Sequence, residues 1–519
     1  MKTFFFYDLE TSGLNPREDR IMQFAGQRTD MDLKPVGEPV NILVKMTDDA
    51  LPSPGAINVT KITPQQTLMD GISEAEFCKY IIEEIFVPDT VAVGYNTVRF
   101  DDEFMRAILW RNFYDPYEWE WRDGRSRWDM LDVVRLTRAL RPEGIEWPFT
   151  EEGKPTNRLE LLTKLNGLSH KHAHDALSDV YATIAVAKLI KEKQPDLFKF
   201  LFSIRNKNDV KKIVNLDEKK PFVYASGRYS SEFNKTTVVF PLTSGRNGNV
   251  LVYDLRHDLG RLLAEPIFSD AGLEFSSTSY AGAPGEPSLR DEPVDQSSAG
   301  RRLDTKRKRF VHSAPTAVGD VRNIRVENSN HSMHPKKQTS ATRSTFFPIV
   351  KELCLNKCPA VAPLGVLDKN DGWEKIGLTR ETIEQNLRIL LEHPEFAEQM
   401  REEYENRPEF PPAVEPETAL YDGFLNDVDR AKVAAVRNAE PNKLADFHPD
   451  FIDERLPELV LHYKGRNFPE TLSESEVEKY EEYRRTRLER QVPRFMAELE
   501  KVQDDFIKDE LLLYMQSLQ

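Results

Sequence analysis

Residues 4–11 read Phe4-Phe5-Phe6-Tyr7-Asp8-Leu9-Glu10-Thr11, an apolar run that ends in two acids. We expect a buried strand here, and because side chains alternate between the faces of a strand, Asp8 and Glu10 project from the same side. Two neighbouring carboxylates repel each other, and burying them is costly unless a cation neutralises them. The pair therefore indicates half of a divalent-metal site. A strand that runs out into a solvated acidic turn is the simpler alternative, because short acidic motifs often match by chance.

The chain has 519 residues, a length typical of several domains, and its 39% hydrophobic and 30% charged residues are typical of a soluble globular protein. No apolar run is long enough to predict a membrane span, and the first residues lack the features of a secretory signal. The three cysteines, Cys78, Cys354 and Cys358, do not complete a zinc site. We therefore expect a reducing, cytoplasmic setting without a membrane partner.

The net charge of −15 argues only superficially against a nucleic-acid partner, since one basic stripe can bind phosphate on an acidic protein. Residues 297–343 hold eleven Lys or Arg against three acids, so the rest of the chain carries −23. Any binding surface outside that stretch must be a concentrated patch. We interpret the basic cluster 306–309 within this stretch as part of a solvated linker. A flexible DNA-binding arm and a nuclear-localisation-like string are the alternative interpretations.

Residues 1–190 alternate strand-like and helix-like segments, which predicts an α/β domain. The clearest helix begins near Asp175, a candidate N-cap, because Leu177, Val180 and Ile184 recur at helical spacing. The other expected elements are strands at 4–8, 21–30, 39–45 and 90–94 and helices at 74–85, 104–113, 130–140 and 158–165.

Residues 195–352 predict a small β domain, interrupted by a disordered insertion at 270–343 where hydrophobic periodicity is lost. Residues 355–519 predict an all-α domain. Its expected helices lie at 381–391, 396–406, 427–438, 473–487 and 494–515.

Three further candidates for the metal site lie downstream: an acid at Asp101 or Asp102, then His174, then Asp179. Two metal ions about 3.5–4 Å apart can clamp the attacking and leaving oxygens of a phosphodiester, which requires several converging carboxylates. A neutral histidine can take a proton from the attacking water. Taken singly, Asp101 is explained as a helix cap, His174 as a surface histidine and Asp179 as a polar helix position.

Taken as a set, Asp8-x-Glu10-Thr11, Asp101 in a Tyr-Asn-x-x-x-Phe-Asp context and His174-x4-Asp179 resemble the DEDDh family of 3′→5′ exonucleases. The resemblance is closer still to the bacterial exonuclease I family and covers nearly the whole chain except the insertion. The matching segments are 94–103, 111–117, 126–129, 139–145, 158–160, 173–184, 205–207, 420–424, 429–430 and 466–469.

This resemblance implies a ribonuclease H-like exonuclease domain at 1–190, an SH3-like β domain at 195–352 and a helical C-terminal domain at 355–519, together forming a C-shaped clamp. It implies processive, Mg²⁺-dependent release of mononucleotides from the 3′ end of single-stranded DNA, in repair and recombination. Two metal ions per site, replaceable by Mn²⁺, would be held by Asp8, Glu10, Asp101 and Asp179, with His174 as the general base. The family pattern favours Asp101 over Asp102. A monomer is expected, with the tail of a single-stranded-DNA-binding protein as a partner near Arg141.

Residues 106–128 interleave arginines with aromatic residues. Aromatic faces stack on bases without choosing sequence, while Arg pairs with phosphate, so this mixture suits a groove for single strands. A duplex would hide the base faces. We expect a third to a half of these aromatics to be core. The substrate contacts that the resemblance favours are Glu10, Arg106, Tyr117, Trp121, Arg135, Arg158 and Lys207.

Two rival functions remain at this point. One is a DEDDh exonuclease acting on RNA or on a proofreading substrate, against which the aromatic groove and the long helical domain argue. The other is a catalytically dead single-strand-binding module, against which the presence of all five expected catalytic residues argues.

Overall fold

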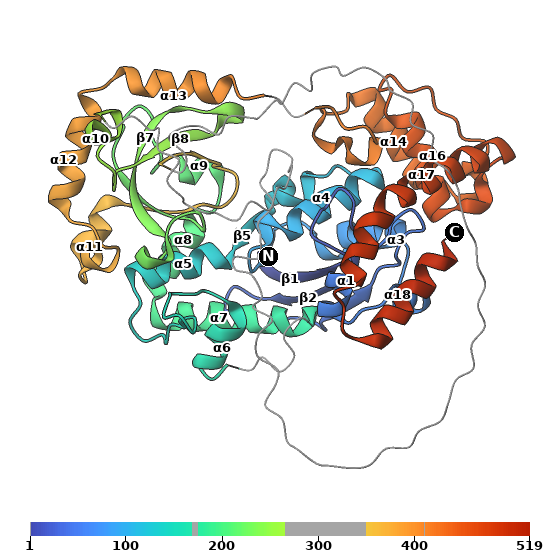
Figure 1. The fold of residues 1–519 in the computed structure, drawn as a ribbon, viewed down its shortest axis with the longest axis horizontal. Helices are drawn as coiled ribbons and strands as arrows, with labels where there is room; N and C mark the ends of the chain where they lie inside the picture. Colours follow the sequence, from blue (N-terminus) through green and yellow to red (C-terminus); the bar gives the residue numbers. More distant parts are fainter. Residues whose placement is uncertain (1, 169–174, 265–348, 409–410, 519) are drawn as a thin grey trace, which may run out of the picture. The chain divides into compact units, whose positions relative to one another are not determined.

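The computed structural model describes residues 2–168, 175–264, 349–408 and 411–518 (Figure 1). His174 and the predicted insertion at 270–343 lie outside these residues. Within them, the strands form two five-stranded sheets, of order β3-β2-β1-β4-β5 and β10-β6-β7-β8-β9.

The first sheet is built around β1 (Thr3–Thr11), which pairs with β2 (Ile21–Thr29) in antiparallel and with β4 (Thr90–Gly94) in parallel orientation. β3 (Val40–Leu43) forms one edge of the sheet and pairs with β2 in antiparallel orientation. β5 (Ser126–Asp129) forms the other edge and pairs with β4 in parallel orientation. The predicted α/β domain, with antiparallel strands first, is confirmed.

Helices cover both faces of this sheet because β1 is apolar on both faces. Phe4 and Phe6 pack in one core with α5 (Met130–Leu140) and α7 (Ala176–Lys193). Phe5, Tyr7 and Leu9 pack in another with α3 (Glu74–Tyr80) and α4 (Asp101–Arg111). Figure 1 shows α7 running along β1 and β2, which it contacts.

Shorter elements complete this part of the chain. The expected helix at 74–85 divides into α3 and a π-helical turn, η1 (Ile81–Ile85). Three single 3₁₀ turns are η2 (Thr97–Arg99), η3 (Glu118–Glu120) and η4 (Arg122–Gly124). The remaining helices are α1 (Pro54–Thr60), α2 (Pro64–Asp70), α6 (Leu159–Leu165), α8 (Pro195–Ser203) and α9 (Lys207–Val210).

The second sheet is entirely antiparallel and extends beyond residue 352, where we placed the end of the β domain. Its strands are β6 (Phe222–Ala225), β7 (Thr236–Ser244), β8 (Val250–Asp254), β9 (Val350–Leu353) and β10 (Ala360–Pro363). α13 (Glu395–Glu405) packs on β7, and its Tyr404 hydroxyl donates to the Val350 carbonyl at 2.7 Å. We therefore propose that this domain continues to about residue 406.

The elements next to this sheet are short, apart from one long helix. They are η5 (Ser231–Phe233), η6 (Arg246–Gly248), α10 (Leu259–Ala264), η7 (Leu364–Asp368), α11 (Gly372–Lys375) and α12 (Arg380–Leu391).

The C-terminal region is helical, as predicted, but its last two helices divide at a different place. We expected a break before Pro493; instead α17 (Glu474–Leu499) continues through it, and α18 (Asp505–Ser517) begins after Asp504, whose side chain caps it. Proline removes one helical hydrogen bond, but the carbonyl it would have satisfied belongs to the exposed residue Glu489, where water can replace the bond. The preceding elements are η8 (Pro416–Tyr421), α14 (Asp427–Asn438), α15 (Pro441–Leu444), α16 (Leu456–Asn467) and η9 (Pro469–Thr471).

A buried ionic cluster joins these helices to the first sheet. The carboxylate of Asp49 is fully buried and lies 3.0 Å from Arg20 Nη2 and 3.4 Å from Arg466 Nη1, while Arg487 Nε donates to its carbonyl at 3.0 Å. Burial opposes ionisation of Asp49, but the three guanidinium groups outweigh it and hold the pKa of this carboxyl well below its ordinary value. Among the described residues, no helix is long and apolar enough to cross a membrane.

Replacing Asp49→Asn should lower the free energy of unfolding at pH 7 by about 3–5 kcal/mol, because it leaves buried guanidinium groups uncompensated. A depressed carboxyl pKa stabilises the fold above the unfolded-state pKa of about 3.9, so the difference from wild type should narrow as pH falls below that value. Urea titrations at several pH values measure both effects.

Asp504→Asn is the matched control, since that carboxylate pairs with Lys61 at the surface, at 3.1 Å. It should change stability little. Equal losses in the two variants would contradict a special contribution of the buried cluster.

Candidate active site

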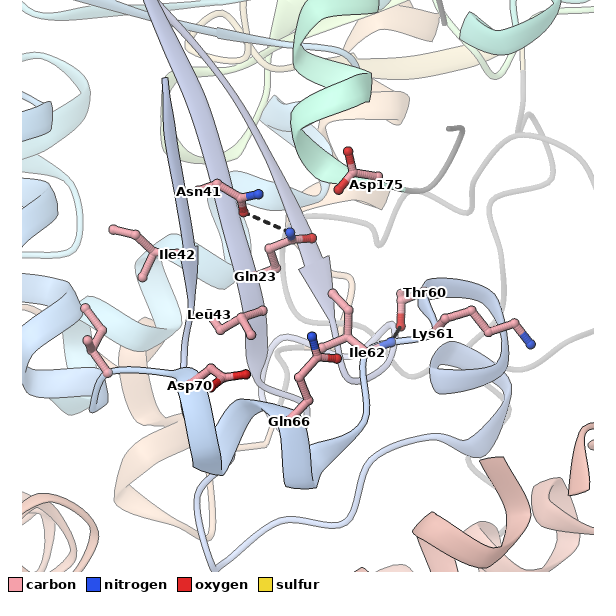
Figure 2. Close-up of a pocket in the computed structure, with 11 residues that line it drawn as sticks. Gln23, Asn41, Ile42, Leu43, Thr60, Lys61, Ile62, Gln66, Asp70 and Asp175 are labelled. Atoms are coloured by element: carbon pink, nitrogen blue, oxygen red, sulfur yellow. Dashed lines mark hydrogen bonds between the residues drawn. The ribbon is translucent and has the colours of Figure 1, made fainter. Parts of the chain in front are cut away.

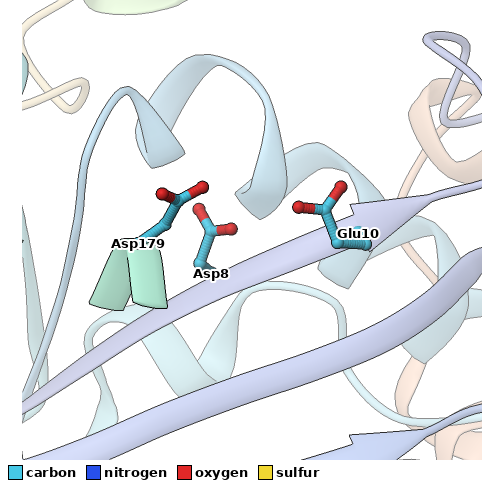
Figure 3. A group of neighbouring side chains, drawn as sticks. All are labelled: Asp8, Glu10 and Asp179. Atoms are coloured by element: carbon cyan, nitrogen blue, oxygen red, sulfur yellow. The ribbon is translucent and has the colours of Figure 1, made fainter. Parts of the chain in front are cut away.

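Three carboxylates converge at one end of β1. One ligand oxygen each from Asp8, Glu10 and Asp179 lies within 4.8 Å of the other two (Figure 3). Glu10 is buried, and Asp8 and Asp179 are half-buried. Figure 3 shows Asp8 and Asp179 facing each other, with Glu10 further along the strand. Such a group of hard oxygen donors suits a cation such as Mg²⁺ or Mn²⁺.

The alternation of β1 explains why these acids meet. Asp8 and Glu10 continue the face that carries Phe4 and Phe6, and α7 covers that face. Asp179 lies in the first turn of α7, whose start is fixed by Asp175: its side chain accepts a hydrogen bond from Ser178 N at 3.1 Å. The apolar part of β1 therefore packs against the middle of α7, and the acidic part of β1 lies at the start of that helix.

Asp101 and Asp102, which the residues alone did not distinguish, have different partners in the structure. Asp101 Oδ1 accepts from Leu9 N at 3.1 Å, which places this carboxylate beside β1 next to the acidic pair. Asp102 instead accepts from the Tyr7 hydroxyl and pairs with Arg127. Because Tyr7 points to the face opposite Asp8, Asp102 lies in the interior, where burial raises its pKa despite the pairing with Arg127. Asp101 is not a member of the close group of three, and His174 lies outside the described residues.

A pocket of about 600 Å³ is lined by residues of β2 and β3, of segment 60–72 and of the start of α7 (Figure 2). Gln23, which lines it, pairs in register with Glu10 across β1 and β2, so both side chains lie on one face of the sheet. Its Nε2 donates to Asn41 Oδ1 at 2.9 Å, and its buried Oε1 has no hydrogen-bond partner among the described residues. Asp175, the cap of α7, lies on another side of the pocket. The remaining lining residues are Ile42, Leu43, Thr60, Lys61, Ile62, Gln66, Asp70 and Ile72.

Family models match the chain in three consecutive parts. The exonuclease model matches residues 5–187, the exonuclease I SH3-like model 205–268 and 319–406, and the exonuclease I C-terminal model 414–518. Exodeoxyribonuclease I of Escherichia coli K12 is 39% identical over 93% of this chain and 89% of its own. The chain belongs to the exodeoxyribonuclease I family.

Two solved structures extend this match to the fold, and each alignment covers the whole chain. The zinc-bound E. coli exonuclease I complex with single-stranded DNA has a TM-score of 0.80 at 34% identity and is covered to 99%. A complex of SSB and exonuclease I with an inhibitor has a TM-score of 0.76 at 33% identity and is covered to 100%. The expected fold class is confirmed: an exonuclease domain, an SH3-like domain and a helical C-terminal domain.

Among the described residues, the predicted DNA-binding cations differ in exposure. Arg106 is buried between Glu103 and Glu120, at 2.7 Å and 2.6 Å, and its guanidinium lies over the Tyr117 ring. Arg135 is buried against Asp132 at 2.8 Å. The other predicted cations lie nearer the surface: Arg158 is half-buried before α6, and Lys207 is exposed at the start of α9. Their roles as substrate contacts stay predictions.

The aromatic residues of 106–128 divide into core and surface. Four of the seven belong to the core, slightly more than the expected third to a half: Trp110, Phe113, Trp119 and Trp128 are buried. Tyr114 and Tyr117 are half-buried, and burial raises the pKa of Tyr117 to about 12. Trp121 is 64% exposed, which leaves its ring accessible for stacking.

Sequence reasoning missed two features of the site, an aromatic residue and a pocket. Phe424, from the C-terminal region, is 80% exposed and approaches Tyr117 edge-on, with ring centroids 6.0 Å apart. An apolar residue directly after Gly423, which has a φ of +124°, was the available signal. The pocket beside Glu10 was also missed, because its lining comes from separate elements and carries no motif.

Replacing Asp179→Asn should abolish stabilisation by divalent metal without unfolding the protein. In wild type, Mn²⁺ at about a hundred times its Kd should raise the unfolding free energy by about 2.7 kcal/mol. Without metal, the variant should be at least as stable as wild type, because one of three repelling charges is gone. Thermal unfolding with and without Mn²⁺ measures this, with the exposed Asp196→Asn on α8 as control. An unchanged Mn²⁺ response in Asp179→Asn would show that the metal binds elsewhere.

Proposed function

We propose that this chain is a Mg²⁺-dependent 3′→5′ exonuclease that degrades single-stranded DNA to mononucleotides. The observation that carries the proposal is the convergence of Asp8, Glu10 and Asp179 beside Asp101, within a chain of the exodeoxyribonuclease I family. The single-stranded DNA in the related E. coli complex supports the choice of substrate. The all-oxygen donor set favours Mg²⁺, with Mn²⁺ as a substitute, over a softer metal.

In the proposed reaction, Asp8, Glu10, Asp101 and Asp179 hold the metal ions, and His174 accepts the proton of the attacking water. Two bound metal ions would supply Lewis-acid stabilisation of the attacking and leaving oxygens of the phosphodiester. The carboxylates lie at the end of β1 and the start of α7, so the packed cores on both faces of the sheet hold them in place. His174 precedes Asp175, the residue that caps α7.

The pocket beside Glu10 would receive the 3′-terminal nucleoside. Its volume is in the range of small-ligand pockets, and it combines apolar side chains such as Ile62 with the amides of Gln23 and Asn41. The register pair of Glu10 and Gln23 supports this assignment, because Gln23 lines the pocket and lies across from Glu10. A terminal nucleoside seated there would bring the phosphodiester linkage on its 5′ side to the metal ligands.

The strand leading to the site would cross the exposed rings of Trp121 and Phe424 and the half-buried ring of Tyr117. Stacking on these rings needs accessible base faces, and this requirement favours single strands over duplex. Roles in repair and recombination, processive action and a monomeric state are further parts of the proposal. The related complex of SSB and exonuclease I supports SSB as a partner. The proposal puts the SSB tail near Arg141, whose guanidinium joins the end of α5 to the Val366 carbonyl.

The deciding assay compares 3′-labelled single-stranded DNA, duplex DNA and RNA with Mg²⁺ or with EDTA. We expect release of mononucleotides from single-stranded DNA with Mg²⁺ only. Preference for RNA would contradict the substrate, and activity that survives EDTA would contradict the metal mechanism.

Replacing His174→Ala should lower turnover by about 10²–10⁴-fold, the usual contribution of a general base, while DNA affinity stays unchanged. Single-turnover hydrolysis measures the turnover, and fluorescence anisotropy in EDTA measures the DNA affinity. An equal loss of turnover and binding would remove His174 from the role of base.

Replacing Trp121→Ala should weaken binding of single-stranded DNA by about 1–3 kcal/mol, the usual value of one stacked base. Phe424→Ala should act in the same direction. Phe506→Ala is the control, because this ring is 66% exposed on α18 and is given no role in binding. If all three variants bind as wild type does, the strand follows another path.

A further inference from the structure

The residues adjacent in sequence to two proposed ligands are bonded to each other on the opposite face of the sheet. Tyr7 precedes Asp8, and Asp102 follows Asp101. The Tyr7 hydroxyl donates to Asp102 Oδ1, and both side chains are at least 98% buried. Asp8 faces the metal site while Tyr7 faces the interior, so this single bond ties the ligand-bearing strand to the ligand-bearing turn of α4 from behind.

Arg127, on β5, engages the second oxygen of the same carboxylate. Its Nη1 donates to Asp102 Oδ2, and its Nη2 lies 3.1 Å from Glu120 Oε2. Both oxygens of Asp102 are therefore occupied, and the carboxylate has one orientation. Hydrogen bonds to a planar guanidinium fix direction as well as distance.

The SH3-like domain contributes to this arrangement through the loop that joins β9 to β10, residues 354–358. The carbonyl of Asn356 accepts from Arg127 Nη2 at 2.9 Å, and Cys358 Sγ donates to the Arg127 carbonyl at 3.4 Å. Lys357 Nζ lies 3.5 Å from Glu103 Oε1, in the same first turn of α4. The loop thus contacts both the turn that carries Asp101 and Arg127, the arginine that orients the Asp102 carboxylate.

An ordinary stabilising role is the alternative explanation. Burying a phenol, a carboxylate and a guanidinium is costly, and apolar side chains of the same size would pack the interior as well or better. What apolar packing would not provide is a fixed position of α4 relative to β1. The spacing of Asp8 and Asp101 depends on that position, and metal sites respond strongly to the bonds behind their ligands.

We propose that Tyr7, Asp102 and Arg127 are positioning residues that set the spacing of Asp8 and Asp101, and so the affinity of the site for its divalent ions, with loop 354–358 as their support from the SH3-like domain. The inference rests on the proposed function, in which these two aspartates hold metal. It assigns the SH3-like domain a part in building the metal site.

The test is Tyr7→Phe, which removes one hydroxyl and keeps the ring packed against Phe24 and Trp119. Mn²⁺ binding measured by titration calorimetry should weaken by about 10-fold to 100-fold, the usual effect of losing such a bond. The kcat should fall, while the KM for single-stranded DNA and its Kd in EDTA stay at wild-type values. Tyr404→Phe is the matched control, since its buried hydroxyl donates to the Val350 carbonyl in the SH3-like domain; it should bind Mn²⁺ as wild type does.

Arg127→Lys is the second variant, and it decides the question if Tyr7→Phe does not fold. It keeps a positive charge beside Asp102 but loses the second amino group that reaches Asn356. Weaker Mn²⁺ binding is again expected. Wild-type Mn²⁺ affinity in every folded variant of Tyr7 and Arg127 would overturn the inference. The proposed function would fail separately, through a wild-type protein whose Mn²⁺ binding does not depend on Asp8.

Discussion

Mutual repulsion of carboxylates is the constraint on which the rest of this structure depends. Asp8, Glu10 and Asp179 are held within reach of one another although carboxylates repel each other. A flexible scaffold would let them separate. Here β1 is packed on both faces, so neither the strand nor α7 moves without disturbing a hydrophobic core. The energy that holds the acids together comes from apolar burial several residues away from them.

Several buried charges away from the site follow a different rule, because an opposite charge lies beside each of them. Asp49 lies among Arg20, Arg466 and Arg487, and Arg106 lies between two glutamates. These clusters join segments that are distant in sequence: the Asp49 cluster links the first sheet to the C-terminal helices. The contrast helps to recognise function, since a group of like charges indicates a cation while a balanced group indicates structure.

The fold and the acids of the site were largely predictable from sequence, and the reasons are local. The alternation of Phe4 to Glu10 and the cap at Asp175 act over a few residues, and both the strand and the helix form where they were expected. What depends on distant contacts was not predictable. The family pattern favoured Asp101 over Asp102, but the physical reason, the bond from the Tyr7 hydroxyl to Asp102, is not visible in the sequence. The burial of Arg106 and Arg135 also depends on partners that no periodicity predicts. The continuation of α17 through Pro493 likewise depended on solvent at Glu489, which a proline rule alone does not include.

The short pairing of β4 with β1 has a consequence for tolerated changes in length. The two strands pair only from Thr3 to Phe6, and the chain then crosses through η2 to begin α4 at Asp101. One residue more or fewer in this crossing would turn the start of the helix by about 100°. Asp101 would leave the Leu9 amide, and Asp102 would leave Tyr7. The segment 95–100 should therefore keep its length in working relatives even where its side chains vary, whereas surface loops elsewhere are free to gain or lose residues.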